Sequence, residues 1–392
     1  MYVLIIATLV LIVNWLIEFY RHQRNVNAIP VRIHVNGTRG KSSVTRLIAA
    51  GLRAGGLKTI GKTTGTLPRV LLPDGKESSI IRLMGANIIE QKYIFRYAAS
   101  QKPDAIVIEC MAVNPAYQWI TERKFVRSTI GVITNARPDH LDLMGSTVQS
   151  VTMCLSNTIP SHGVCYTAEE EQYKIMQNVA KHRHCEIHKI RPVDVTDEEM
   201  ARFPYIEHKE NVQLSLSVCQ RAGVNREVAL KGMQTSTPDP GALKKYFVND
   251  NGKQIVFYNV FAANDPSSTE FIYKLVTDKL DHEVCKMVVL NSRADRYFRS
   301  QQLVDICHNI NYDYLLLTGE IPEKVYQYAL SQNLPKEKVL AIGEIPPVEL
   351  FKKILSLTGK ESHIIGIGNI AGKNKYGAHI VKYFKDKSNG II

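Results

Sequence analysis

A short glycine-rich segment that carries one lysine is the part of this sequence best suited to chemistry. It reads Gly37-Thr38-Arg39-Gly40-Lys41-Ser42-Ser43 and lies between the apolar run Val31–Val35 and a helix-like stretch that begins at Val44. Small residues between a strand and a helix let backbone N–H groups face an anion, and the helix N-terminus adds a partial positive charge. In such a loop the lysine contacts the β- and γ-phosphates of a nucleotide and the serine binds Mg²⁺. The segment therefore predicts a nucleotide site with Lys41 as phosphate clamp and Ser42 as metal ligand.

Two further polar groups follow runs that are typical of buried strands. Glu109 closes the apolar part of Ala105–Cys110, and Asp139 and His140 come one short turn after Ser128–Thr134. A buried carboxylate is costly unless it is paired or bound to metal, and the carboxyl ends of parallel strands converge. We therefore expect Glu109 and His140 to bind metal beside the loop. Taken singly, Glu109 is also explained as a capping or ion-paired acid, and Asp139-His140 as a helix cap. The strand that precedes the loop argues against reading it as an ordinary helix start.

The elements that must position these groups alternate between strand and helix. A mostly parallel sheet covered by helices follows from this alternation, which places the chain in the α/β class. A Pro- and Gly-containing stretch, Thr235–Lys245, reads as a linker, so we expect two α/β domains at about 30–236 and 237–392, the second smaller and Rossmann-like. The runs read as strands are Val31–Asn36, Ala105–Cys110, Ser128–Thr134, Gly163–Tyr166, Gln254–Phe261, Lys286–Asn291, Tyr312–Thr318, Lys338–Ile342 and Ser362–Ile367.

The N-terminus differs in composition from the rest of the chain. No charged side chain occurs between Met1 and Ile17, and about 17–20 helical residues at about 1.5 Å each can span a bilayer core. Interfacial aromatics and two arginines follow, namely Trp15, Phe19, Tyr20, Arg21 and Arg24. Basic residues on the C-terminal side predict a single-pass membrane anchor over 1–20, with the catalytic domains in the cytoplasm. A buried amphipathic or partner-binding helix is the alternative.

The net charge of the chain indicates which kinds of partner it could bind, and its cysteine content indicates the redox compartment. The formal net charge of +12 fits an acidic substrate or an anionic membrane surface, or it is general surface chemistry. The basic residues are scattered and no aromatic-basic RNA-binding pattern occurs, so nucleic acid is not expected. Seven cysteines without a C-x-x-C pair favour reduced thiols in the cytosol. Cys110 has no base identifiable near it in the sequence and is read as a buried structural thiol.

With these motifs in place, the chain resembles the Mur ligase superfamily of ATP-dependent amide ligases. The loop has the short spacing G-T-x-G-K-S, with Val35 where the commonest phosphate loop has glycine. Glu109 after a central strand, the N-x-x-x-D-H-x-D run Asn135–Asp142 and the segment His208–Asn211 match as well. The resemblance implies that Asn211 meets the nucleotide base.

Finer motifs resemble one branch of that superfamily, the poly-γ-glutamate ligases of capsule biosynthesis. They cover nearly the whole chain: Gly61–Thr66, Glu109–Pro115, Pro238–Ala242, Ala262–Ser268, Arg293–Arg296 and Gly366–Ile370. The resemblance implies that ATP phosphorylates a glutamyl carboxylate and that the amine of another unit then attacks, with Mg²⁺ as cofactor. It also implies glutamate, the growing chain and membrane subunits as partners, and it allows a homo-oligomer. The substrate-binding residues that it implies are Thr64, Asn264, Asp265, Arg293, Asp295 and Arg296.

Some departures from the superfamily pattern accompany the resemblance. Only the apolar segment and a short basic stretch precede the loop, where a muramyl ligase would carry a UDP-binding domain. Many relatives use a carbamylated lysine after the metal-binding histidine, yet no lysine lies between His140 and Lys174. Asp265-Pro266 is also explained as a helix N-cap followed by proline. The alternatives left open are a folylpolyglutamate-type ligase and a membrane-tethered P-loop ATPase that powers export.

Overall fold

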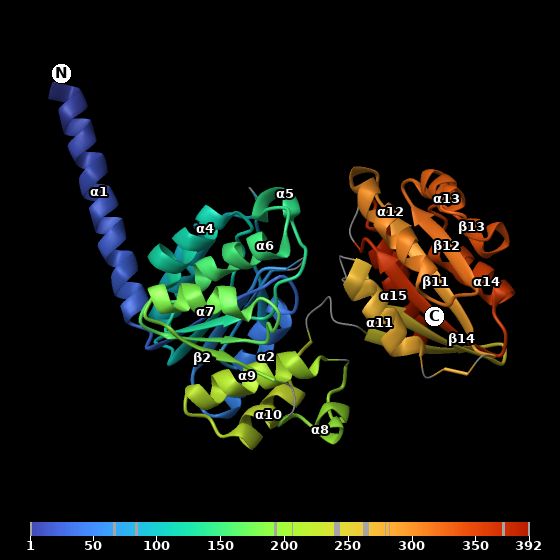
Figure 1. The fold of residues 1–392 in the computed structure, drawn as a ribbon, viewed down its shortest axis with the longest axis horizontal. Coiled ribbons are helices and arrows are strands. Elements are labelled where there is room, and N and C mark those ends of the chain that lie inside the picture. The colour runs from blue at the N-terminus through green and yellow to red at the C-terminus, as the bar shows by residue number, and fades with distance from the viewer. Residues whose placement is uncertain are drawn as a thin grey trace. The chain divides into compact units, whose positions relative to one another are not determined.

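The computed structural model divides the chain into two compact units, Met1–Pro240 and Gly241–Ile392 (Figure 1). Each unit is built around its own sheet with helices on both faces, as the alternation of strands and helices predicted. The structure describes residues 2–65, 68–82, 85–191, 194–205, 207–238, 244–261, 266–278, 280–281, 283–370 and 373–390.

Unit 1 contains an eight-stranded sheet with the order β4-β3-β2-β5-β1-β6-β7-β8. All neighbouring strands from β2 to β8 pair in parallel, whereas β3 and β4 form an antiparallel edge. The strands are β1 Val31–Asn36, β2 Thr59–Thr63, β3 Arg69–Leu71, β4 Glu77–Ser79, β5 Ala105–Glu109, β6 Ile130–Ile133, β7 Val164–Thr167 and β8 Glu186–Lys189.

Helices cover both faces of this sheet because alternate residues of its strands are apolar on each side. One layer packs Leu47 of α2, Leu216 of α9 and Leu230 of α10 against Ile33 and Val35 of β1. The opposite layer consists of α3, α6, α7 and the end of α1. The helices are α1 Tyr2–Asn27, α2 Lys41–Ala54, α3 Glu90–Ser100, α4 Pro115–Ile120, α5 Leu141–Met144, α6 Val148–Leu155, α7 Tyr173–His182, α8 Asp197–Ala201, α9 Lys209–Arg221, α10 Arg226–Gln234, the π-helix η1 Thr121–Val126 and the 3₁₀ turn η2 Ser156–Thr158.

Helix α1 is a single helix of 26 residues whose two ends lie in different surroundings. An 18-residue window of it has a mean hydropathy of 2.2 and none of it is buried, so by length and composition it can cross a membrane. Its last turns are buried through His22 and Val26, and the His22 ring packs edge-on against Phe95 and Phe125. The apolar part extends beyond the rest of unit 1 (Figure 1).

Unit 2 contains a six-stranded sheet with the order β13-β12-β11-β14-β10-β9, which is parallel except for β9. Phe257 of β10 stacks on Phe384 of α15 in a core that also includes α14. Its strands are β9 Lys244–Asp250, β10 Lys253–Asn259, β11 Cys285–Ser292, β12 Tyr314–Gly319, β13 Val339–Ala341 and β14 Glu361–Gly368. Its helices are α11 Pro266–Thr277, α12 Tyr297–Asp305, α13 Pro322–Ser331, α14 Pro347–Leu357 and α15 Tyr376–Ser388, with 3₁₀ turns η4 Ala294–Arg296, η5 Ile306–His308 and η6 Lys336–Lys338.

Every run that the sequence analysis read as a strand contains one in the structure, with ends shifted by at most two residues. The strands that it missed are β2, β3, β4, β8 and β9. They escaped detection because β2 is interrupted by Gly61 and Lys62, and because β4, β8 and β9 expose polar side chains at the sheet edges.

Candidate active site

The glycine-rich loop connects β1 to α2 and needs glycine at two of its positions. Gly37 has φ +133° and a Cβ there would overlap the Thr134 hydroxyl, while Gly40 has φ +79° and a Cβ there would lie 2.8 Å from Asn211 Oδ1. A side chain at either position would be both strained and blocked. The loop is therefore pressed between β6 and the first turn of α9, which holds its backbone in one shape.

The Lys41 ammonium lies over this loop. Its Nζ donates to the carbonyl oxygens of Gly37 at 2.6 Å and Thr38 at 3.2 Å. An ammonium held by the loop carbonyls, at the N-terminus of α2, faces the place where a phosphate would meet the loop's N–H groups. The position fits the phosphate clamp that the sequence predicted.

Glu109 is the point at which three segments of the chain meet. Its carboxylate, at the end of β5, accepts a hydrogen bond from Ser42 Oγ at 2.8 Å and from the Thr64 backbone N–H at 2.7 Å. The side chain is buried, and Gln91 Nε2 contacts its backbone carbonyl at 3.4 Å. A hydroxyl and a carboxylate at this distance are hard oxygen ligands of the kind Mg²⁺ takes together with phosphate oxygens and water. The residues present therefore fit the metal.

Beside Thr64 lies a charged cluster that the sequence analysis did not single out. Arg82 donates to Thr64 Oγ1 at 3.0 Å and forms a two-pronged ion pair with Glu90, which Lys62 Nζ also contacts at 2.7 Å. Lys62 has no exposed surface, and burial lowers its pKa although Glu90 opposes the change. Burial acts to raise the pKa of Glu90, but Arg82 and Lys62 outweigh it and lower that pKa. Lys62 belongs to the Gly61–Thr66 motif, and that motif is the feature of the sequence from which its role near the site could have been predicted.

The segment after β6 holds the loop from the other side. Asn135 Oδ1 accepts from Thr38 Oγ1 at 2.7 Å and from the Arg39 backbone N–H at 3.1 Å, and its Nδ2 donates to the Arg39 carbonyl at 3.2 Å. Asn135 was quoted only as the first residue of a motif. The structure gives it a definite contact, because one amide side chain ties two consecutive loop residues to the end of β6.

Among the described residues, His140 forms no hydrogen bond or ion pair with Ser42 or Glu109. It has φ +45°, precedes α5 and is 52% exposed, and its Nε2 is 3.9 Å from Asp139 Oδ1. Asp139 in turn pairs with Arg39 of the loop at 3.5 Å. Within the part of the chain that the structure describes, no three His, Cys, Asp or Glu side chains are grouped to hold a metal. The structure thus places His140 at the carboxyl edge of the sheet without a formed ligand set around it.

Asn211 lies against the loop, as required for a residue near the nucleotide. It is buried in the first turn of α9, touches the Cβ position of Gly40, and donates from Nδ2 to Glu207 Oε1 at 2.8 Å. Ser43 follows Ser42 in the first turn of α2. The loop, Thr64, Glu109 and Asn211 are therefore brought together within unit 1.

The candidate residues of unit 2 follow β11. Arg293 forms a two-pronged ion pair with Asp295, at 2.9 and 2.7 Å, and Arg296 ends the same short turn η4. Glu320, which the sequence analysis missed, accepts the backbone N–H groups of Ala294 and Lys373, each at 3.1 Å. Asn264 and Asp265 lie outside the described residues, and α11 begins at Pro266, as expected for a proline in the first helical turn.

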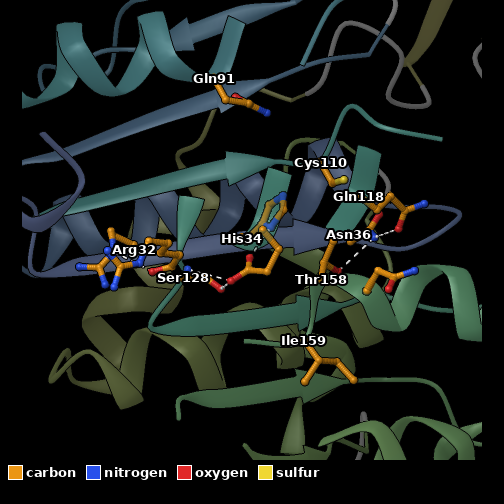
Figure 2. A network of polar contacts seen from close by, with 12 residues as sticks. Arg32, His34, Asn36, Gln91, Cys110, Gln118, Ser128, Thr158 and Ile159 are labelled. Atoms are coloured by element: carbon orange, nitrogen blue, oxygen red, sulfur yellow. Dashed lines mark hydrogen bonds and ion pairs between the residues drawn. The ribbon is translucent and has the colours of Figure 1, made fainter. Parts of the chain in front are cut away.

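A buried polar network supports the strand that leads into the loop (Figure 2). Arg32, His34 and Asn36 share one face of β1 because alternate residues of a strand point the same way. Asn36 Nδ2 donates to Gln118 Oε1 at 2.8 Å and Thr158 Oγ1 at 3.1 Å, directly before Gly37. The base of the loop is thereby fixed to helices on this face of the sheet.

His34 is the centre of this network. Its Nδ1 is 2.7 Å from Glu122 Oε2, and Glu122 Oε1 accepts from the Ser128 hydroxyl and N–H at 2.9 and 3.0 Å. Burial opposes the charged imidazolium, but the neighbouring Cys110 and Glu122 outweigh it and raise the pKa of His34 to about 9. His34 therefore lies beside Cys110 as a group that is protonated near neutral pH, and the Cys110 thiol itself is buried.

The fold of each unit and its match to known families agree. Residues 35–235 match the Mur ligase middle domain, and residues 245–387 match the poly-gamma-glutamate synthase CapB C-terminal domain. A phosphate loop backed by a Ser–Glu–Thr cluster in a domain of this family defines an ATP-dependent amide ligase of the Mur type. Within that class the chain belongs to the CapB family of poly-γ-glutamate synthases.

Two relatives carry the family assignment. The chain is 37% identical over 378 residues to the PGA synthase CapB of Bacillus subtilis (strain 168), which covers 95% of both chains. It is 34% identical over 370 residues to the capsule biosynthesis protein CapB of Bacillus anthracis, which covers 94% of this chain and 80% of that one. The resemblance stated from the motifs is confirmed.

Solved structures share the fold at lower sequence identity. A Mycobacterium tuberculosis folylpolyglutamate synthase, complexed with ADP and AMPPCP, has a TM-score of 0.70 and 14% identity, covering 94% of this chain and 93% of its own. Escherichia coli FolC in complex with DHPP and ADP has a TM-score of 0.67 and 13% identity, covering 93% and 92%. The far higher identity to the capsule proteins favours that branch over the folate-type alternative.

Proposed function

We propose that this ligase extends a γ-linked glutamate chain through an acyl phosphate. The γ-phosphoryl group of ATP passes to a carboxylate oxygen of one glutamyl unit and ADP leaves. The amine of the next unit attacks the activated carbonyl carbon, phosphate leaves, and loss of a proton completes the amide. The convergence of Thr64 and of Ser42, the residue after Lys41, on Glu109 is the observation that best supports this assignment.

The roles proposed for the residues follow from where charge accumulates. Phosphoryl transfer between two anions needs cations around the transferring group, because negative charge spreads over its oxygens. Lys41 would neutralise the β- and γ-phosphate oxygens, and the loop N–H groups from Gly37 to Ser43 would bind the remaining oxygens. Asn211 would contact the adenine.

Mg²⁺ fits the same centre, and when bound it would neutralise phosphate charge and orient the transferring group. Ser42 Oγ and Glu109 are the ligands that the geometry supports best, and His140 would join them on the acceptor side. Thr64 would position substrate beside this centre, with Arg82 holding the Thr64 hydroxyl.

We propose that the second unit supplies side chains that bind the acidic substrate. Arg293, Asp295 and Arg296 are proposed to bind glutamate or phosphate groups, together with Asn264 and Asp265. The Arg293–Asp295 ion pair orients the guanidinium, and the intrinsically planar guanidinium group suits carboxylate recognition. The proposed partners are glutamate, the growing chain and membrane subunits of a synthase or export complex.

We also propose that α1 anchors the ligase in the cell membrane with both units in the cytoplasm. The length and hydropathy of α1 support this placement, as do the arginines at its C-terminal end.

The test of the proposed function is glutamate-dependent release of ADP by the purified full-length chain, with amide formation measured in parallel. Release of ADP that rises with glutamate and matches the amide formed is the expected result. Hydrolysis of ATP at the same rate with and without glutamate, including after addition of membrane subunits, would instead identify an export ATPase.

A further inference from the structure

A groove between α1 and α3 has the properties of a lipid site. It encloses about 530 Å³ and is lined on one side by a single face of α1, from Leu11 to Asn25, and on the other by the first turns of α3. It lies away from the phosphate loop, because α1 precedes the amino end of β1 and the loop follows its carboxyl end. The ligase mechanism does not use it.

The lining of the groove changes from apolar to cationic along α1. Leu11, Trp15 and Ile17 line the part nearer the N-terminus, whereas Arg21 and Arg96 line the part nearer the sheet. Leu11 and Arg21 are separated by about 15 Å at 1.5 Å per residue. That separation is comparable with the distance between the headgroup and the upper acyl chain of a phospholipid.

The charges at the inner end of the groove are not balanced. Of its three cations, Lys92 is ion-paired with Glu18, and Arg96 stacks over the Tyr93 ring at 5.3 Å. Among the residues that the structure describes, no carboxylate pairs with Arg21 or Arg96. Two arginines without a counter-ion, framed by aromatic rings, are suited to one phosphodiester.

The position of the groove along α1 matches a membrane surface. Residues before Glu18 carry no charge, and Trp15, Tyr20 and the exposed Tyr93 are the side chains that concentrate at membrane interfaces. Basic side chains at that depth attract anionic headgroups of the cytoplasmic leaflet.

We propose that this groove binds one anionic phospholipid, with its phosphodiester on Arg21 and Arg96 and its acyl chains along Leu11 and Trp15. The proposal rests on the membrane anchoring proposed above. A lipid held there would lie against both α1 and α3, and it would fix the angle at which the helix leaves unit 1.

The test uses the detergent-solubilised full-length chain and native mass spectrometry with phosphatidylglycerol. The wild type is expected to retain one phosphatidylglycerol and not phosphatidylcholine of the same acyl chains. The double variant R21E/R96E is expected to lose retention on the order of tenfold. Arg24→Glu, on the same helix but outside the groove, is the matched control and should retain the lipid.

Other outcomes separate the possible sources of failure. Equal retention by the wild type and R21E/R96E, or equal retention of the two lipids, overturns the proposal. Protection of the wild type from thermal unfolding by inorganic phosphate alone, to the same extent as by phosphatidylglycerol, assigns the site to a free anion and overturns it as well. Extraction of the wild type from membranes by alkaline carbonate refutes the anchor, whereas glutamate-dependent ADP release tests the ligase separately.

Discussion

At the scale of single residues, the proposed site consists of side chains whose partners belong to the loop or to the segment that follows β2. The Lys41 ammonium donates to two loop carbonyls, and Glu109 accepts from Ser42 and Thr64. Each of these groups is ordered by the protein before any phosphate binds. Such preorganisation is what makes charges effective in phosphoryl transfer.

Replacing Lys41 by alanine should abolish amide formation in a folded protein. The variant loses the cation that neutralises the transferring group, and we expect glutamate-dependent ADP release to fall by about a hundredfold or more. Lys76→Ala is the matched control, because Lys76 is 81% exposed in the turn between β3 and β4. Full activity of a Lys41→Ala protein with an unchanged thermal unfolding midpoint would refute the assigned nucleotide site.

Gly40→Ala should damage the same site by shape alone. Its Cβ would lie 2.8 Å from Asn211 Oδ1 at a φ of +79°, so the loop must shift and strain is added, on the order of 1–2 kcal/mol. We expect a higher KM for ATP together with a lower unfolding free energy. Asn211→Ala in the same chain should restore part of the stability but not the affinity for ATP, and restoration of both would argue against nucleotide contact by Asn211.

At the scale of elements, β1 is fixed to its neighbours by buried polar contacts as well as by its ladder. His34 connects β1 to Glu122 of η1, and Glu122 connects in turn to Ser128 before β6. Breaking a buried pair leaves one charge without its partner, and the destabilisation is on the order of 3–5 kcal/mol. These contacts lie on one face of β1, the strand that leads into the loop (Figure 2).

The stability of this network should depend on pH with a definite sign. The pKa of His34 is raised from 6.5 to about 9, so the folded state holds a proton that the unfolded chain releases. The contribution of the His34 proton to the free energy of unfolding is therefore complete below about pH 6.5 and is lost as the pH rises through about 9. Denaturant unfolding of the wild type and of Glu122→Gln across pH 6–10 measures this contribution. The wild type should lose stability as the pH rises over that range. The variant should be less stable at pH 6, and its stability should depend less on pH. Parallel profiles would contradict the assignment.

At the scale of the whole molecule, the chain combines an apolar helix with two α/β units. The apolar part of α1 is exposed, whereas its last turns pack through His22 and Val26 into the core of unit 1. The membrane attachment and the nucleotide site that we propose therefore lie at opposite ends of β1. The two functions should be separable.

Deleting residues 2–20 should release the ligase from the membrane fraction and leave the buried turn of α1 in place. We expect glutamate-dependent ADP release by the truncated chain to remain within about twofold of that of the full-length protein in detergent. The deleted residues are exposed and lie outside the core and the proposed site, and changes at such positions shift stability by about 0.5 kcal/mol or less. The measurements are alkaline carbonate fractionation and ADP release per mole of protein. A truncated chain that still sediments with membranes would show that another surface anchors it.

Much of the fold follows from local pattern. Short β-branched runs bounded by turn residues predicted the central strands of both sheets, because buried parallel strands are apolar on both faces. The edge strands β4, β8 and β9 were not predicted, since their exposed polar side chains follow no such pattern, whereas the edge strand β13 was predicted. β2 shows the same limit inside the sheet, where the buried Lys62 pairs with Glu90 of a separate element.

The sequence by itself determined the phosphate loop, the apolar helix, the α/β class and the family, because each depends on residue types at short spacing. Only the tertiary structure decided which groups meet at the site. The strand order β5-β1-β6 brings Glu109, the loop and Asn135 to adjacent strand ends, and α9 closes on Gly40 with Asn211. The His34–Glu122 contact spans 88 residues and the groove at Arg21 and Arg96 joins two helices. Contacts of this range are set by how elements pack, and no local spacing encodes them.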